Sequence, residues 1–308
     1  MRSFSLWRGG SERLAKTFDA LDMPRRKKRL ERLVVTLAAV GFLIHLGLIC
    51  VARNLPQIAP EALNDLDRNY LHAVYTPFSF ILFYEVLLLV FALPQSFTIS
   101  IGKQYEIISL IIIRRVFKDI GEFKDPADWM SQSEAAYMVL GDMVGAVVMF
   151  LLVTLFHYIR ASIVRAEPDS ETGDFIRIKK SIAVLLLGLL LTLAGYNTML
   201  WVGQLGSGSH TGPSTPMDLD GFFFPMFFEV MIFTDVFLLI VSLPFYERYE
   251  YVIRNSGFVI ATVLLRFSLS TPKPYDLAVG LIAMVYGLCV LGVFSFFARV
   301  TGRQVDSS

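Results

Sequence analysis

Long apolar stretches that recur along the chain limit its fold more than any other feature. A helix needs about 20 mostly apolar residues to cross the hydrocarbon core of a bilayer. Eight stretches approach that length: 33–52, 76–94, 97–116, 136–159, 181–203, 222–245, 250–269 and 276–298. Hydrophobic residues fill 55% of the 308 positions and charged residues only 18%, which is far from the composition of an ordinary soluble domain. The sequence therefore predicts an all-α, polytopic integral membrane protein with eight transmembrane helices.

The positions of the basic residues predict which connecting segments face the cytoplasm. Lys and Arg gather in the N-terminal segment 1–32, in the linker 161–180 and near the tail 300–308, whereas residues 204–221 contain neither. Eight spans place all three basic segments on one side. We therefore expect a multi-pass protein of a bacterial-type plasma (inner) membrane with both termini in the cytoplasm. Residues 11–22 fit either a short amphipathic helix on the inner surface or a disordered basic tail.

The two halves of the chain echo each other. The matched positions are Glu85 with Asp235, Leu93-Pro94 with Leu243-Pro244, Lys103 with Arg254, and Arg115 with Arg266. These matches suggest two four-helix units, 33–160 and 181–299, produced by duplication. Four spans are an even number, so the units should enter the membrane in the same sense, as parallel repeats related by an axis along the membrane normal. Chance similarity between apolar segments is the alternative interpretation.

Each predicted unit carries a carboxylate in its second span. Glu85 and Asp235 lie nine residues before a Leu-Pro that should mark the inner boundary, so each is about 13 Å inside the membrane. An acid at that depth must pair with a cation, take up a proton or contact water. We expect Lys103 to pair with Glu85 across the following hairpin, and Arg254 to pair with Asp235 in the same way.

Further charged residues within the spans extend this set. Arg115 should lie near the outer surface and could meet Asp142, while Tyr286 is the nearest polar candidate for Arg266. Glu106 is predicted at the depth of Glu85, where two carboxylates would share a proton or bind a cation. The position equivalent to Glu106 in the second unit is Gly257. The complete set of candidate ion-pathway or charge-pair residues is Glu85, Lys103, Glu106, Arg115, Asp142, Glu229, Asp235, Arg254 and Arg266.

No motif for a reaction or for a cofactor is present. The sequence lacks a Walker loop, a dinucleotide fingerprint, HExxH, GxSxG and CxxC, and its two intramembrane histidines, His45 and His157, have no ligand spacing. We therefore predict no catalytic residue, no metal and no cofactor, and an enzyme is the third choice. The net charge of +1, with its basic residues in separate clusters, does not indicate nucleic-acid binding.

A four-helix unit with an acid in its second span is similar to a voltage-sensing domain in helix count. The similarity does not extend to the charges, because Arg114 and Arg115 are adjacent rather than three apart and no span carries a ladder of arginines. No family is assigned on this basis.

Two functions fit these observations. The first is a membrane transport protein or channel that moves cations or protons through polar sites in its two bundles. The alternative is a non-catalytic structural or accessory subunit of a larger membrane complex, in which the same charges hold helices in register. Gly141 and Gly145 form a GxxxG pattern that permits close helix approach within the chain or in a homo-oligomer. The predicted partners are thus the lipid bilayer and either further copies or other subunits.

Overall fold

The computed structural model describes residues 2–54, 70, 72–122, 133–164, 173–207, 223–246 and 248–305. Within these ranges the chain is almost entirely helical and contains no strand, which confirms the all-α prediction. Most of residues 53–75 and of 204–221, and the end of the predicted tail 300–308, lie outside the described residues.

Nine α-helices and one 3₁₀ turn are described. They are α1 (Arg2–Leu21), α2 (Pro24–Asn54), α3 (His72–Ala92), α4 (Phe97–Glu122), α5 (Ser133–Val164), α6 (Gly173–Ser207), α7 (Phe223–Ser242), η3 (Leu243–Phe245), α8 (Tyr249–Ser270) and α9 (Tyr275–Val305). The two Leu-Pro pairs fall at the ends of α3 and α7, because proline disfavours helical geometry in the residue before it and lacks an N–H to donate. Both pairs thus lie at helix ends, while the membrane boundary predicted there stays a prediction.

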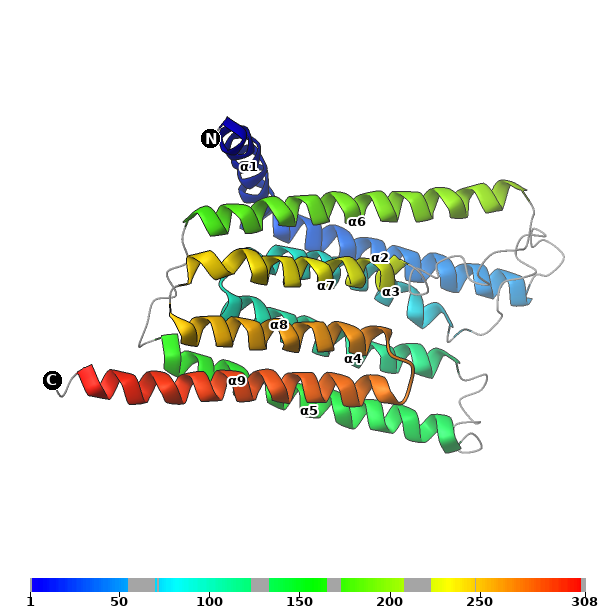
Figure 1. Cartoon of the computed structure of the whole chain (residues 1–308). Coiled ribbons are helices and arrows are strands. Elements are labelled where there is room, and N and C mark those ends of the chain that lie inside the picture. Colours follow the sequence, from blue (N-terminus) through cyan, green and yellow to red (C-terminus); the bar gives the residue numbers. More distant parts are fainter. Residues whose placement is uncertain are drawn as a thin grey trace.

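The helices form two layers (Figure 1). One layer contains α2, α3, α4 and α5 and the other α6, α7, α8 and α9, and each helix packs against its neighbours in sequence. The layers meet where α3 contacts α6, α4 contacts α8 and α5 contacts α9. Each predicted unit is thus a single layer rather than a separate bundle, because a row of four helices can bury an apolar face only against the other row.

The order of the helices corrects the predicted symmetry. A twofold axis along the membrane normal, placed between the layers, would run the second layer in the reverse order and set α2 opposite α9. Instead α4 faces α8 and α5 faces α9, so the second layer runs in the same order as the first.

Helix α4 occupies the centre of the molecule. Its residues Ile107 and Ile111 pack into an apolar cluster with α3, α6 and α7, while Ile101, Ile108 and Ile112 pack into a second cluster with α5, α8 and α9. Apolar residues on two faces of one helix explain why α4 packs against helices of both layers. They also explain why its charged residues must find partners inside the protein.

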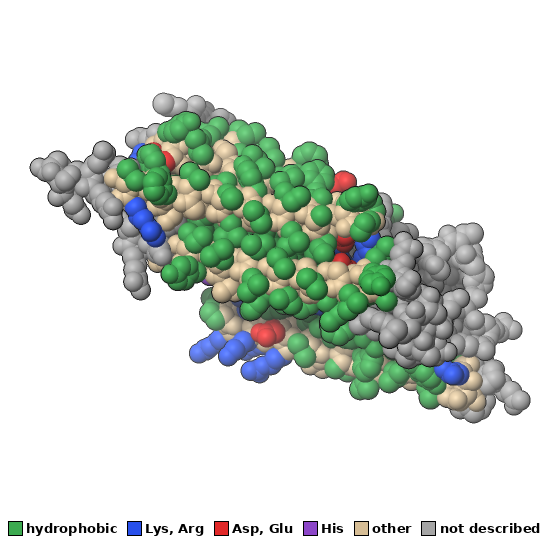
Figure 2. Space-filling view, turned by 90° about the horizontal axis from the view of Figure 1, so that it is seen from below, with side chains coloured by type: hydrophobic (Ala, Val, Ile, Leu, Met, Phe, Trp, Pro, Cys, Tyr) green, Lys and Arg blue, Asp and Glu red, His purple; other side chains and the backbone are tan. Residues whose placement is uncertain are grey.

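The surface of the protein suits a lipid environment. Figure 2 shows hydrophobic side chains over the middle of one face and charged side chains towards its ends. Six helical stretches are long and apolar enough to cross a membrane: Pro24–Asn54, Ala136–Ala161, Gly173–Tyr196, Met226–Phe245, Tyr249–Ser270 and Tyr275–Val300. Within the described residues α3 contributes only a shorter apolar stretch, Thr76–Ala92, and α4 is not among the six. These are the features of a helical membrane protein.

Basic residues mark one end of the molecule, called here the basic end. It includes Arg25–Arg29 at the start of α2 and Lys179 and Lys180 near the start of α6, and both chain termini lie there (Figure 1). Helix α1 packs on α6, where the Ser181 hydroxyl donates to the Ser11 carbonyl at 3.2 Å and Lys180 pairs with Asp19 at 2.6 Å. Residues 11–21 are therefore helical and packed on α6, while their place at the inner membrane surface stays a prediction.

Close packing of α9 against α4 gives a prediction about two glycines of one helix. A Cβ added at Gly287 would lie 1.9 Å from the Tyr105 hydroxyl, and Tyr105 is fully buried; a Cβ at Gly292 would meet nothing within 4 Å. We expect Gly287→Ala to lower the free energy of unfolding by about 1 to 3 kcal/mol through overpacking. Gly292→Ala should leave it unchanged or raise it by up to about 1 kcal/mol. Thermal unfolding in detergent compares the two variants. Equal changes in stability would contradict the packing of Tyr105 on α9.

Candidate functional site

A buried ion pair between α7 and α8 lies at the middle of the molecule. The Asp235 carboxylate is 5% exposed and pairs with the fully buried guanidinium of Arg266. It also accepts a hydrogen bond from the Thr262 hydroxyl at 3.1 Å. Arg266 in turn donates to the side-chain oxygen of Gln104, on α4 of the other layer, at 3.3 Å. Charge in the apolar interior is thus compensated by one opposite charge and by polar contacts from both layers.

The predicted partner of Asp235 was wrong. Arg254 lies near the basic end of α8, with its guanidinium 4.9 Å from the Tyr251 ring centroid and 4.7 Å from that of Phe294, and it donates to Asn255 at 3.1 Å. Asp235 is level with Thr262, which is about 12 Å further along α8 than Arg254. The 3₁₀ turn between α7 and α8 lengthens the connection, so the carboxylate is level with a later residue. Tyr286, the predicted neighbour of Arg266, is instead partly exposed on α9.

The equivalent acid in the first layer also has a partner other than the predicted one. Glu85 is 3% exposed and pairs with Arg114, not with Lys103. Arg114 lies eleven residues, or about 16 Å, beyond Lys103 on α4. The signal that could have identified it is the Arg114-Arg115 pair itself. Neighbouring side chains point about 100° apart around a helix, so one arginine can face α3 while the other faces α8 and α9.

Lys103 and Glu106 form a separate polar group with His157. Lys103 donates to Glu106 at 2.6 Å, and the other oxygen of that carboxylate lies 2.8 Å from the His157 ring nitrogen of α5. All three side chains are about one-third to one-half exposed. Glu85 is level with Arg114, about 12 Å along α4 from Glu106. The predicted two-carboxylate site is therefore not formed.

Ion pairs join the layers at the end opposite the basic end. Arg115 of α4 pairs with Asp276 of α9 at 2.6 Å and donates to the Leu269 carbonyl of α8 at 3.0 Å. Asp142 of α5, the predicted partner of Arg115, instead binds Lys273 at 2.8 Å, and Lys273 also pairs with Asp119. The packing of α9 and its preceding turn against α4 and α5 determines these partners, and it could not be read from the sequence.

The remaining candidate, Glu229, is exposed on α7 and does not join any of these groups. Among the helices that the structure describes, no group of three or more His, Cys, Asp or Glu residues is arranged to hold a metal ion.

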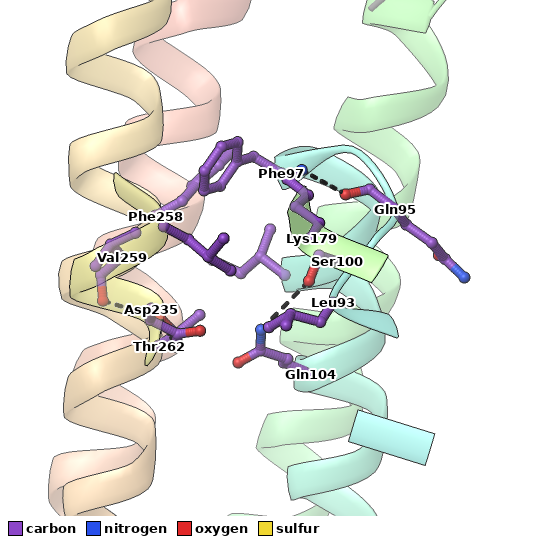
Figure 3. Close-up of a pocket in the computed structure, with 12 residues that line it drawn as sticks. Leu93, Gln95, Phe97, Ser100, Gln104, Lys179, Asp235, Phe258, Val259 and Thr262 are labelled. Atoms are coloured by element: carbon purple, nitrogen blue, oxygen red, sulfur yellow. Dashed lines mark hydrogen bonds between the residues drawn. The ribbon is translucent and has the colours of Figure 1, made fainter. Parts of the chain in front are cut away.

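A small cavity lies beside Asp235, on the side towards the basic end, and Figure 3 shows the residues that line it. Its volume is about 30 Å³, room for about one or two water molecules. Its lining residues are Leu93, Gln95, Phe97, Ser100, Ile101, Gln104, Lys179, Asp235, Leu238, Phe258, Val259 and Thr262. At the basic end Lys179 is 1% exposed and donates to the Gln95 carbonyl at 2.9 Å. At the inner end lies the Asp235 carboxylate.

Polar groups therefore follow one another along the contact between α4 and α8. From the basic end, Ser100 accepts a hydrogen bond from Gln104 at 3.4 Å, and Gln104 contacts Arg266. The Leu269 carbonyl, one turn beyond Arg266, accepts from Arg115. Arg115 then reaches Asp276 at the opposite end. This polar row, made by residues of both layers, is the candidate site.

Comparison of the chain with protein-family models, with curated proteins and with solved structures gave no match. The functional proposal for this chain accordingly starts from the polar row and its chemistry.

Removing one member of the buried pair should be more damaging than removing both. Asp235→Asn leaves Arg266 charged and unpaired in the interior, which should lower the free energy of unfolding by about 3 to 5 kcal/mol. The double variant Asp235→Asn/Arg266→Gln should recover much of this loss. An exposed pair gives the control: neutralising Glu12 and Lys16, which are 3.4 Å apart, should cost less than about 0.5 kcal/mol. The free energy of unfolding is measured in detergent for each single variant and for the double variant. If the losses of Asp235→Asn and Arg266→Gln simply add up in the double variant, the pairing is contradicted.

We expect the contribution of Lys273 to the free energy of unfolding to be lost at alkaline pH. Burial lowers the pKa of its ammonium group, but hydrogen bonds and the charges of Asp119 and Asp142 raise it more, so the pKa lies above the ordinary lysine value. A pKa raised by folding means that the stabilisation is complete below the unfolded pKa of about 10.4 and is lost as pH rises through the folded value. Because the side chain is about one-third exposed, we expect a contribution of about 1 to 2 kcal/mol.

The measurement is the difference in unfolding free energy between the wild type and Lys273→Gln. That difference should be constant from neutral pH to about pH 10 and then shrink. The exposed Lys16→Gln variant is the control and should show little difference at any pH. A difference that is already lost near neutral pH would show that Lys273 does not bind these carboxylates.

Proposed function

We propose that this protein transports protons or small cations across a membrane, with the polar row between α4 and α8 as the pathway. The observation that carries the proposal is the small cavity that is lined both by Lys179, towards the basic end, and by Asp235 of the buried pair. Ionisable groups are expensive inside a bilayer, and a row of them between two helix layers is characteristic of an ion or proton path. An apolar contact would pack these layers with less desolvation.

Asp235 would be the proton- or cation-accepting group. In the closed arrangement its negative charge is held by Arg266, so protonating it would leave that arginine buried without a counter-charge. Arg266 would then need another partner, and the nearest polar groups are Gln104 and the carbonyls near the end of α8. Loading of Asp235 is thereby coupled to movement of Arg266 between the layers. This coupling distinguishes a transporter from an open pore.

The same proposal includes eight membrane spans. Helices α3 and α4, with 21 and 26 residues, are about 32 and 39 Å long, which is enough to cross a bilayer core. Both run alongside the six more apolar helices in Figure 1. The buried charges of α4 face partners on other helices, which would explain how so polar a helix can lie within the membrane. The matched acids and Leu-Pro pairs support an internal repeat of α2–α5 in α6–α9.

The basic end would face the cytoplasm of a bacterial-type cell, with the protein in the inner membrane. Support comes from the clustering of Arg25–Arg29, Arg177–Lys180 and Arg299 towards the end that also holds both termini. A membrane-impermeant label on single cysteines at the two ends would test this orientation.

A second function, as a non-catalytic structural or accessory subunit, is favoured by a different observation. Both mid-membrane acids have an arginine partner, and the cavity is too small for a hydrated cation. Charges that are fully paired can fix the register of helices without conducting anything. The protein would then act with other membrane subunits or as a homo-oligomer.

Flux through liposomes separates the two functions. Wild-type protein in liposomes should dissipate a pH gradient, or admit Na⁺ or K⁺, faster than protein-free liposomes. The double variant Asp235→Asn/Arg266→Gln, chosen because it should stay folded, should reduce flux to the background. Glu229→Gln, which neutralises an exposed acid on the same helix, is the matched control and should behave as wild type. Flux that survives in the double variant would exclude Asp235 as the carrier.

A silent wild type in all three ion gradients would refute the transport proposal. Co-purification of a stable partner from native membranes would then support the accessory role.

A further inference from the structure

A groove at the elbow between α1 and α2 lies outside the polar row. It is formed by the end of α1, the first turns of α2 and the end of α3, and it encloses a volume of about 310 Å³. The residues that line it are Leu21, Arg26, Lys27, Arg29, Leu30, Leu33 and Phe91. Four are apolar, three are basic, and none is acidic. A volume of this size is at the lower end of the range for small-molecule sites.

The wall contributed by α2 changes character along its length. Arg26, Arg29, Leu30 and Leu33 are spaced three, four and seven residues apart, so they share one face of the helix. The arginines lie in the first turns, at the basic end, and the leucines follow towards the middle of the molecule. A ligand lying along this face would meet positive charge first and hydrocarbon next.

The three basic residues of the groove differ in how much of their positive charge is free to bind a ligand. Lys27 is 2.5 Å from the Asp22 carboxylate, and its ammonium lies 5.1 Å from the centroid of the Phe91 ring. Its charge is therefore largely compensated. Arg26 and Arg29 are both exposed. Their guanidinium groups are planar, carry several donors and are suited to bidentate binding of phosphate oxygens.

We propose that this groove binds one anionic phospholipid. The phosphate would lie between Arg26 and Arg29, and the first part of an acyl chain would lie along Leu30, Leu33 and Phe91. Charge complementarity favours an anionic headgroup, and basic pockets beside membrane helices on the cytoplasmic side suit such headgroups. The apolar half favours a lipid over a free phosphate, since Leu33 is 55% exposed and an acyl chain along it would bury apolar surface that phosphate cannot.

Occupation would have a structural consequence. The groove contacts α1, α2 and α3 at once, and α1 is itself docked on α6. A lipid held there would join the first helices of the two layers through α1. The inference does not depend on the transport proposal, because neither Asp235 nor Arg266 is part of the groove.

The test uses the purified full-length protein in detergent with three probes. These are phosphatidylglycerol, phosphatidylcholine with the same acyl chains, and inorganic phosphate. Native mass spectrometry counts bound lipid, and thermal unfolding reports stabilisation. We expect one phosphatidylglycerol molecule to stay bound to each protein in native mass spectrometry. Phosphatidylglycerol should also raise Tm more than phosphatidylcholine does. Inorganic phosphate should give little stabilisation.

Two double variants with the same loss of charge locate the site. Arg26→Gln/Arg29→Gln should weaken phosphatidylglycerol binding roughly 25-fold, at about fivefold for each arginine near a membrane surface. Arg25→Gln/Lys28→Gln, on the same helix but outside the groove, should change it much less. Leu33→Asn should weaken lipid binding without altering the weak response to phosphate.

Three outcomes would overturn the proposal. Equal losses from the two double variants would indicate a diffuse surface charge rather than a site. Equal binding of phosphatidylcholine would remove the role of the anionic headgroup. Stabilisation by inorganic phosphate equal to that by phosphatidylglycerol would indicate a phosphate site without a lipid. If Arg26→Gln/Arg29→Gln fails to fold, the single variants Arg26→Gln and Arg29→Gln, compared with Leu33→Asn, test whether the groove binds the lipid.

Discussion

The cost of placing charge away from water determines how this protein is put together. Helix α4 carries Glu106, Arg114 and Arg115 through the centre of the molecule, and it can do so because other helices supply partners. Glu85 comes from the same layer, Asp276 from the other layer, and His157 from a helix on its flank. Packing alone would leave the choice among neighbouring registers of α4 to shape, whereas the ion pairs add a penalty for each charge left without a partner. With these partners its register and rotation are both defined, and the two layers are held in one relative position.

The sequence was sufficient for the helices, and for the burial of the two acids, because those features depend on local composition. Runs of apolar residues predict spans, and each Leu-Pro marks a helix end whatever surrounds it. Partners depend on rotation about helix axes and on which rows of helices face each other. A hairpin argument therefore chose Lys103 and Arg254, the cations nearest in sequence to each acid. The actual partners, Arg114 and Arg266, lie further along, and Arg115 finds Asp276 only because α9 packs beside α5 and near α4. Nothing local in the sequence reports that packing.

The two layers use equivalent positions for different purposes. In the first, the Glu85–Arg114 pair is formed by neighbouring helices of one layer. In the second, Arg266 binds Asp235 and also reaches Gln104 across the layers. At the position that matches Glu106, Gly257 lies so close to α9 that an added Cβ would be 2.7 Å from a Val290 methyl carbon. An acid cannot fit there. Packing between α8 and α9 thus removes one polar group from the second layer, and the polar chemistry concentrates around Asp235.

The polar row is not uniform from end to end, and the difference bears on how it could open. Its middle is fully buried, so separating Asp235 from Arg266 without replacement partners is costly. At the opposite end, the Lys273–Asp119 pair is only partly buried, so separating it should cost less than separating the fully buried Asp235–Arg266 pair. The weakest tie between the layers is therefore at the end furthest from the cavity. Under the transport proposal, separation of the layers at that end first would make Asp235 accessible from the side opposite to the cavity. The uneven burial of these ion pairs would then favour alternating access without a hinge in any helix.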